Sequence, residues 1–187
     1  MACAVHPSRR LAGTLFILGA ALVWSVVGLF SKHCLQAGMD PLQCAFQRAF
    51  FGFAAFFVHM ALAGQFRIPW RHAFAFALFG GCLVMAGVLG AQALWGASPV
   101  RTDFAWDVWL ASAGTGVVCT YLAYVCLAEA LKRISLVQTV VTSELEPVLA
   151  MLWLWLAFGE CFIPIGWIGS ALIIAAVLLM TLFGGDA

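Results

Sequence analysis

Charged residues are scarce in this chain of 187 residues: only 9% are Asp, Glu, Lys or Arg, against about 25% in a soluble domain. The charges nearly cancel to a net +1, so the composition gives no indication of a nucleic-acid partner. Long polar stretches and low-complexity segments are also missing from the sequence. Apolar residues make up 65% of the chain and its mean hydropathy is +1.05. These values exclude an ordinary soluble domain and indicate a membrane protein.

Clustered metal ligands and catalytic motifs are missing as well. The seven cysteines are scattered, mostly within apolar runs, with no CxxC spacing and no close Cys/His cluster. We interpret them as small apolar side chains in the membrane, and we expect no metal and no cofactor. The sequence contains no nucleophile motif, so we expect that the protein is not an enzyme. The cysteines are Cys3, Cys34, Cys44, Cys82, Cys119, Cys126 and Cys161.

Long apolar runs dominate the chain. A bilayer core of about 30 Å requires roughly 20 apolar residues in helical conformation. The links between the runs are too short for a soluble domain, so we expect one membrane domain, 1–187, an all-α bundle of about six transmembrane helices. The expected spans are 11–31, 42–64, 73–95, 108–130, 137–159 and 164–183.

The links also orient the bundle. Six Lys/Arg residues fall on one side and two on the other. Because positive residues concentrate on the cytoplasmic side, we expect both termini to be cytoplasmic, in a multi-pass protein of the inner membrane. The majority side has Arg9, Arg10, Arg67, Arg71, Lys132 and Arg133, and the other side has Lys32 and Arg101.

Away from the span ends, four Arg, His or Glu residues lie inside the expected spans: Arg48, His59, Glu144 and Glu146. An intramembrane charge costs about 2.5–3.5 kcal/mol on insertion scales, so such groups usually face a partner or a cavity. We expect His59 to be hydrogen-bonded at a helix interface. For Arg48, two alternatives stay open: its side chain extends to the membrane surface, or it pairs with Glu144.

The span 137–159 has the most informative pattern. On a regular helix Thr139, Ser143 and Glu146 share one face, whereas Glu144 points about 160° away. Pro147 has no amide hydrogen, so it leaves the carbonyl of Ser143 without its helical partner. Irregular backbone at membrane depth occurs where it is buried in protein or lines a cavity. The pattern therefore favours a substrate or ion pathway at Thr139, Ser143, Glu146 and Pro147, with Arg48 in support. The alternative is a kinked helix whose glutamates bond to neighbouring helices.

Several motifs resemble those of EamA-type permeases of the drug/metabolite transporter superfamily. At the C-terminal end, TYLAYVCLAEALKRISLVQ, LEPVLAMLWLWLAFGE and IGWIGSALIIAAVLLM resemble the last three helices of that family. The matching positions include Pro147, the pair Gly159-Glu160 and the pair Ile168-Gly169. At the N-terminal end, Trp24, Asp40-Pro41 and Arg48 match the first two helices.

This resemblance implies a specific organisation. Full members of the family have ten helices in two inverted repeats. Residues 1–66 resemble family helices 1–2, and residues 71–184 resemble helices 7–10. The alternative is a single five-helix half with one inserted helix. Small residues in three spans favour close helix packing, so we also expect self-association.

The resemblance implies transport of small organic metabolites or drugs across the bilayer. The alternative is a non-transporting membrane remnant, or an interaction subunit, of the same lineage.

The charge asymmetry predicts which links face the cytoplasm. A single cysteine introduced at Ile68, in a background without other cysteines, should resist a membrane-impermeant maleimide added outside the cell. A single cysteine at Thr102 should be labelled. Labelling of position 68 from outside would contradict the predicted orientation.

Overall fold

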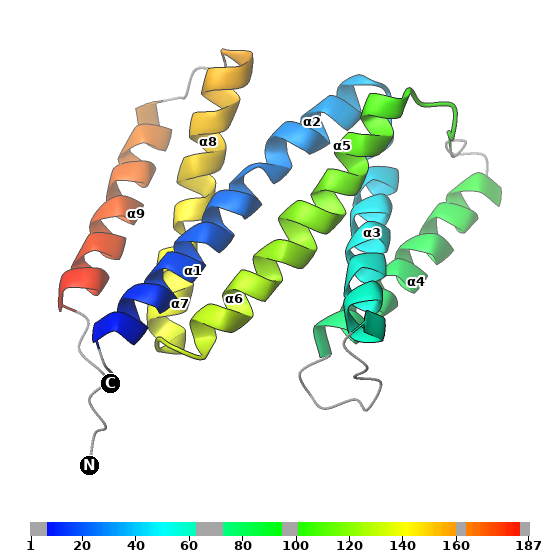
Figure 1. Ribbon diagram of the computed structural model, residues 1–187. Coiled ribbons are helices and arrows are strands. Elements are labelled where there is room, and N and C mark those ends of the chain that lie inside the picture. Colours follow the sequence, from blue (N-terminus) through cyan, green and yellow to red (C-terminus); the bar gives the residue numbers. More distant parts are fainter. Residues whose placement is uncertain (1–6, 63–72, 95–100, 160–163, 184–187) are drawn as a thin grey trace. The chain divides into compact units, whose positions relative to one another are not determined.

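The computed structural model describes residues 7–62, 73–94, 101–159 and 164–183, and every regular element in these ranges is a helix. The predicted all-α fold is therefore confirmed for this part of the chain. The helices are α1 (Pro7–Ser25), α2 (Val27–Gln36), α3 (Pro41–Leu62), α4 (Ala73–Leu94), α5 (Trp106–Gly116), the π-helix η2 (Val117–Leu122), α6 (Ala123–Leu131), α7 (Leu136–Ser143), α8 (Leu145–Phe158) and α9 (Pro164–Phe183) (Figure 1).

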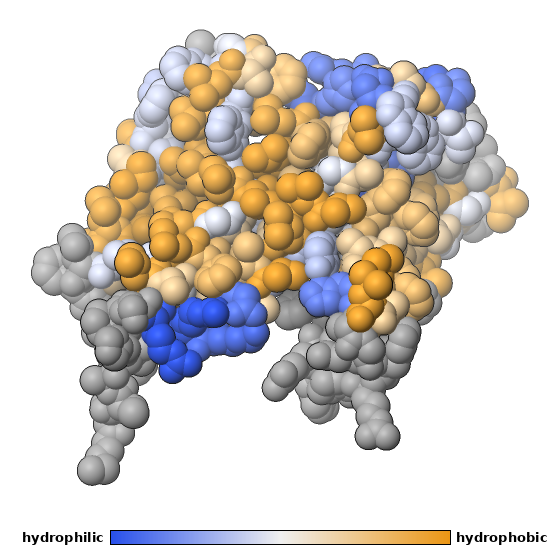
Figure 2. Space-filling view, in the orientation of Figure 1, coloured by the Kyte–Doolittle hydropathy of each residue, from blue (hydrophilic) through white to orange (hydrophobic). Residues whose placement is uncertain are grey.

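Five continuous helical segments in the described ranges are long and apolar enough to cross a membrane. The remaining predicted span, 73–95, corresponds to α4, in which Gly80–Ala91 forms a shorter apolar stretch. Large apolar side chains cover much of the visible surface, and hydrophilic residues gather near the helix ends (Figure 2). The five segments are Arg9–Gln36, Pro41–Leu62, Trp106–Leu131, Leu136–Phe158 and Pro164–Thr181.

Three of the predicted spans are not regular helices. The first is interrupted at Val26, between α1 and α2. The fourth contains the six-residue π-helix η2, and the fifth is interrupted at Glu144. The hydrophobic pattern predicts where these spans lie, but among the three irregularities only the one at Glu144 has a nearby proline to indicate it.

The described helices form two compact units. The first comprises α1 and α6 to α9, within residues 1–29 and 122–187. In it, α1 packs against α6, α7 and α8, while α9 packs against α7 and α8. Its core is built around Ile17, Ala20, Ala130 and Ile134. Alanine at two of these positions allows the helix backbones to approach closely.

The second unit, residues 30–121, contains most of α2 together with α3, α4, α5 and nearly all of η2. Here α3 packs against both α4 and α5. Buried Cys34 and Cys44 are part of its core, as expected of cysteines that serve as small apolar side chains. Met39, Val108 and Ala111 complete that core, with Phe30 and Phe104 against it.

Helices α3 and α5 approach most closely at two glycines. A Cβ atom at Gly116 would lie 2.7 Å from the amide nitrogen of Gly52 and 2.8 Å from the carbonyl oxygen of Arg48. Both atoms belong to the backbone, so no side-chain rotation could relieve the overlap. Only glycine at position 116 permits this crossing.

We therefore expect Gly116→Ala to lower the free energy of unfolding by about 1–3 kcal/mol, as overpacking does in a tight core. The thermal unfolding midpoint of the purified protein in detergent measures the change. Gly80→Ala on α4 is the matched control, because its Cβ would meet nothing within 4 Å. Equal midpoints for the two variants would contradict the tight crossing.

Candidate functional site

The interruption between α7 and α8 is the first irregular feature of the site. Helix α7 ends at Ser143, Glu144 caps it, and α8 begins at Leu145. Pro147 lies in the first turn of α8 and cannot donate a hydrogen bond to the Ser143 carbonyl. The predicted break is thus present, with Glu144 at its centre.

The predicted pathway residues differ in burial. Thr139 is only 1% exposed, Ser143 and Glu146 are half-buried, and Glu144 and Pro147 are exposed within the chain. The hydroxyl of Ser143 donates to the Val140 carbonyl, 2.7 Å away. The buried polar side chains of α7 are Gln138, Thr139 and Thr142. Because the break lies between Ser143 and Glu146, the two residues belong to different helices. That they share one face with Thr139 remains a prediction.

The two buried threonines of α7 have different hydrogen bonding. The Thr139 hydroxyl donates to the Ser135 carbonyl at 2.9 Å. Thr142 is equally buried, at 1% exposure, but its Oγ1 has no hydrogen-bond partner in the described part of the chain. Burying such a hydroxyl costs about 1–3 kcal/mol by protein mutational data. The Thr142 hydroxyl is therefore available to a water molecule or to a bound ligand.

The end of helix α1 forms a further polar contact within the first unit. Ser25, the last residue of α1, is buried, and its hydroxyl donates to the Leu22 carbonyl at 2.6 Å. The same hydroxyl accepts a hydrogen bond of 2.9 Å from the indole of Trp153 in α8. The ring of Trp24 contacts Tyr124 edge to face, with centroids 5.5 Å apart. Side chains beside the interruption at Val26 thus contact two other helices, α8 and α6.

The π-helix η2 contacts both ionisable residues of α3. Arg48 Nε donates to Thr120 Oγ1 at 3.0 Å, and Thr120 in turn donates to the Thr115 carbonyl. His59 Nδ1 lies 2.5 Å from the hydroxyl of Tyr121, so the expected hydrogen bond of His59 is confirmed. Arg48 and Glu144 belong to different units, and their ion pair remains a prediction.

A set of uncharged polar residues in the second unit was not predicted from the sequence. Gln43 and Gln47 are 4% and 5% exposed. The Gln47 side chain accepts a hydrogen bond from the Ser112 hydroxyl, and Gln43 Nε2 donates to the Arg101 carbonyl at 2.5 Å. The sequence does contain a sign of this polar set. Two glutamines are four residues apart in an apolar span, and this spacing places both on one helix face.

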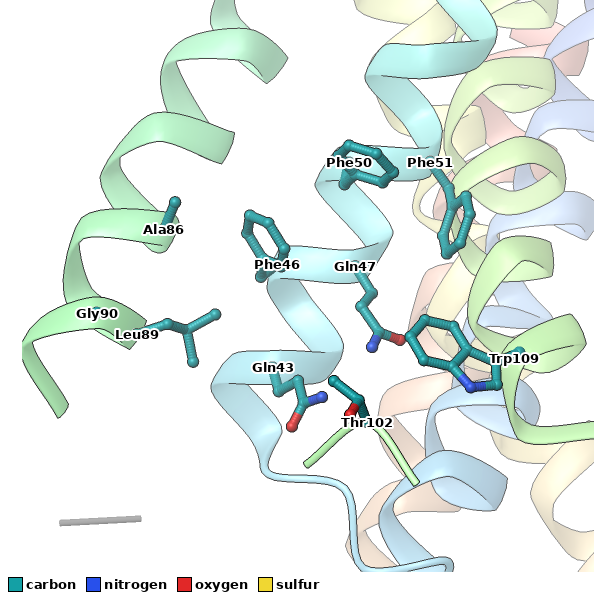
Figure 3. Close-up of a pocket in the computed structure, with 10 residues that line it drawn as sticks. All are labelled: Gln43, Phe46, Gln47, Phe50, Phe51, Ala86, Leu89, Gly90, Thr102 and Trp109. Atoms are coloured by element: carbon teal, nitrogen blue, oxygen red, sulfur yellow. The ribbon is translucent and has the colours of Figure 1, made fainter. Parts of the chain in front are cut away.

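These glutamines line a cavity of about 430 Å³ (Figure 3). Its walls come from α3, α4 and α5, with Thr102 near one end. Aromatic rings from α3 and α5 form much of the lining. The ten lining residues are Gln43, Phe46, Gln47, Phe50, Phe51, Ala86, Leu89, Gly90, Thr102 and Trp109.

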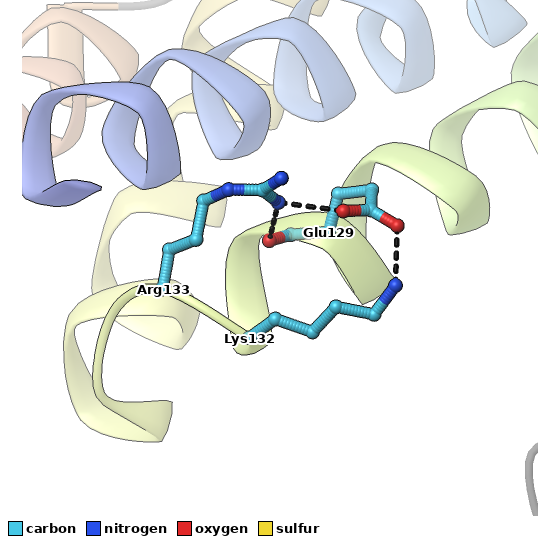
Figure 4. A network of polar contacts seen from close by, with 3 residues as sticks. All are labelled: Glu129, Lys132 and Arg133. Carbon is cyan, nitrogen blue, oxygen red and sulfur yellow. Dashed lines mark hydrogen bonds and ion pairs between the residues drawn. The ribbon is translucent and has the colours of Figure 1, made fainter.

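A charged cluster ends α6 (Figure 4). Glu129 accepts hydrogen bonds from Lys132 and from Arg133, whose Nη1 is 2.6 Å from its carboxylate. The Arg133 guanidinium also lies 4.7 Å from the ring centroid of Phe16. The spacing of three and four residues along the chain brings Glu129 within reach of both cations. We assign this cluster a structural role at the helix end.

In the described part of the chain, no group of three His, Cys, Asp or Glu side chains is placed to hold a metal ion. Away from the helix ends, the polar groups described above are instead amides, hydroxyls and single ionisable side chains such as Arg48 and His59. Such groups can bind and release a ligand by hydrogen bonding.

The model of the EamA-like transporter family matches the sequence twice, over residues 11–102 and 82–182. The chain belongs to the EamA-like transporter family. No curated protein and no solved structure matches it. Together with the apolar helices, the family match shows a multi-pass membrane protein of transporter type. It confirms the family recognised from the Pro147 and Gly159 motifs. Gly159, with φ of +66°, ends α8 as that motif requires, while Glu160 lies outside the described residues.

The two buried threonines give a matched test. Thr142→Val replaces an unpartnered hydroxyl with a methyl group of similar size, so the free energy of unfolding should stay equal or rise by about 1–3 kcal/mol. Thr139→Val removes the hydrogen bond that the Thr139 hydroxyl donates to the Ser135 carbonyl. Its loss should lower that free energy by about 1 kcal/mol. Thermal unfolding in detergent measures both. A larger loss for Thr142→Val than for Thr139→Val would show that the Thr142 hydroxyl has a structural partner.

Proposed function

We propose that this protein is a permease of the inner membrane that moves small organic metabolites or drugs, with both termini in the cytoplasm. The main supporting observation is the interruption between α7 and α8, beside which the buried hydroxyl of Thr142 has no partner among the described residues. A transporter needs polar groups at membrane depth that bind a solute without holding it permanently. Interrupted helices provide them through freed backbone carbonyls.

The proposed pathway consists of Glu146, Pro147, Ser143 and Thr139, with Arg48 in support. Pro147 frees the carbonyl of Ser143, and half-buried Glu146 lies in the first turn of α8. A carboxylate and a free carbonyl close together can coordinate a cation or accept hydrogen bonds from a substrate. Solute exchange and coupling to an ion gradient are both compatible with this chemistry.

Arg48 has a supporting role in the proposal. Its guanidinium is half-buried on α3, and Thr120 binds only its Nε. Among the described residues of the second unit, no carboxylate forms an ion pair with the remaining N–H groups of Arg48. We propose Glu144 as their partner, a pairing that would neutralise two intramembrane charges.

An interaction subunit without transport activity is the second candidate. The two family matches overlap at residues 82–102, so the α4 region belongs to both. This overlap favours a protein whose transport cavity is complete only when two copies of the chain associate. Self-association in lipid bilayers, by crosslinking and mass measurement, is expected of this candidate and also of a permease that works as an oligomer.

We expect Glu146→Gln to abolish counterflow in proteoliposomes while expression and thermal stability remain normal. The variant keeps the size of the side chain and removes its charge. Counterflow of a mixture of labelled metabolites by the full chain is the measurement, since it requires binding and release on both sides. If the wild-type chain shows no counterflow, the interaction-subunit candidate is favoured.

Glu144→Gln is the matched control for this experiment. It should reduce yield or stability more than transport, and Arg48→Gln should show the same defect if the two residues pair. If transport survives Glu146→Gln but is lost in well-folded Glu144→Gln protein, the assignment of the two glutamates is reversed.

A further inference from the structure

The cavity beside Gln43 and Gln47 is partly open, and all of its lining comes from the second unit, from three helices and Thr102. Phe46 and Phe50 of α3 face Ala86 and Leu89 of α4, and Trp109 of α5 lies beyond Gln47 (Figure 3). Its volume of about 430 Å³ is within the range of roughly 300–1,000 Å³ that is usual for small-molecule sites. The cavity is therefore large enough for a ligand of two fused rings.

Two amides supply the polar chemistry of the wall. Gln47 uses its Oε1 to accept from Ser112 on α5, so its Nε2 remains as a donor on the cavity side. Gln43 uses its Nε2 to donate to the Arg101 carbonyl, so its Oε1 remains as an acceptor. One donor and one acceptor thus lie one helical turn apart along α3.

Charge is lacking from the lining. None of the ten lining residues is ionisable. Two cations adjoin lining residues in the sequence, and both have other partners. Arg48 donates to Thr120 on η2, and Arg101 is engaged by the carboxylate of Asp103 and by the ring of Phe104 at 5.3 Å. The hydrogen bond from Arg101 holds the pKa of Asp103 below its ordinary value, so both groups stay charged and paired. A charged ligand would lose its hydration and gain no counter-ion here.

The aromatic rings specify the shape of the ligand. Phe46 and Phe50 are stacked with centroids 6.2 Å apart, and Phe51 meets Phe50 edge to face at 5.6 Å. Trp109 adds an indole from α5. Such rings favour a flat aromatic molecule through offset or edge-to-face contacts.

We propose that this cavity is a binding site for an uncharged, planar aromatic molecule that has a hydrogen-bond acceptor for Gln47 and a donor for Gln43. A lipid acyl chain fits the apolar walls less well, because it would leave Nε2 of Gln47 and Oε1 of Gln43 without a partner at membrane depth. The proposed site depends on the geometry of the second unit alone. Binding there would stand even if the pathway residues proposed above prove inactive in transport.

The test uses 2-naphthamide, which is flat and uncharged and has both a donor and an acceptor. Calorimetric titration of the full chain in nanodiscs, with empty nanodiscs subtracted, should show saturable binding. The anion 2-naphthoate, of the same shape, should bind at least about tenfold more weakly. No saturable binding of 2-naphthamide, or equal binding of the anion, would overturn the proposal.

Two glycines of α4 provide a matched pair for the location. Gly90 lines the cavity and Gly87 does not, and a Cβ atom at either would meet nothing within 4 Å. Gly90→Leu should therefore fill the cavity without disturbing the helix, and it should raise the dissociation constant at least about tenfold. Gly87→Leu should leave it within about twofold. Equal effects of the two variants would place the ligand elsewhere.

A second pair tests the amide. Ser112→Ala keeps the Gln47 amide in the cavity, whereas the double variant Gln47→Met, Ser112→Ala removes both partners of one hydrogen bond and should leave the fold intact. The single variant should bind 2-naphthamide nearly as the wild type does, and the double variant at least about tenfold more weakly. If Gly90→Leu blocks binding but the double variant does not, the cavity holds apolar molecules without amide recognition, and the proposed ligand class is wrong.

Discussion

Every polar group inside the hydrocarbon layer needs a partner from the protein, because lipid offers none. This constraint explains most of the tertiary contacts described above. Ser25 is bonded by Trp153, Gln47 by Ser112, and Arg48 by Thr120. Each bond joins two helices that are distant in the sequence. In a chain with so few charges, such single hydrogen bonds define which helix faces meet.

The same constraint gives meaning to the irregular helices. The side chain of Thr120 bonds to the carbonyl of Thr115, five residues earlier, within the wide turn of η2. That placement also directs Thr120 to Arg48 and Tyr121 to His59. Single-turn π-helices are frequent at functional sites because they realign side chains in this way.

The sequence predicts the apolar spans, the all-α fold and the family, since each depends on patterns of about 20 residues. It also predicts the break beside Glu144, because Pro147 lacks an amide hydrogen. It does not predict the turn at Val26 or the π-helix at 117–122, which have no proline to mark them. Nor does it predict the cavity. Gln43 and Gln47 are visible as polar residues in an apolar span, but only tertiary packing places Trp109 and Leu89 around them. Across the break, helix periodicity could not be used to align Ser143 with Glu146.

The two units are joined within helices, and both junctions lie beside irregular backbone. The chain passes from the first unit to the second at residues 29 and 30, shortly after the turn at Val26. It returns at residues 121 and 122, at the end of η2. Departures from regular α-helix geometry, π-bulges among them, are positions at which helices usually bend. The polar contacts at Ser25, Thr120 and Tyr121 are all within a few residues of these junctions. Some of the residues that satisfy intramembrane polar groups thus lie in the short segments that connect the units.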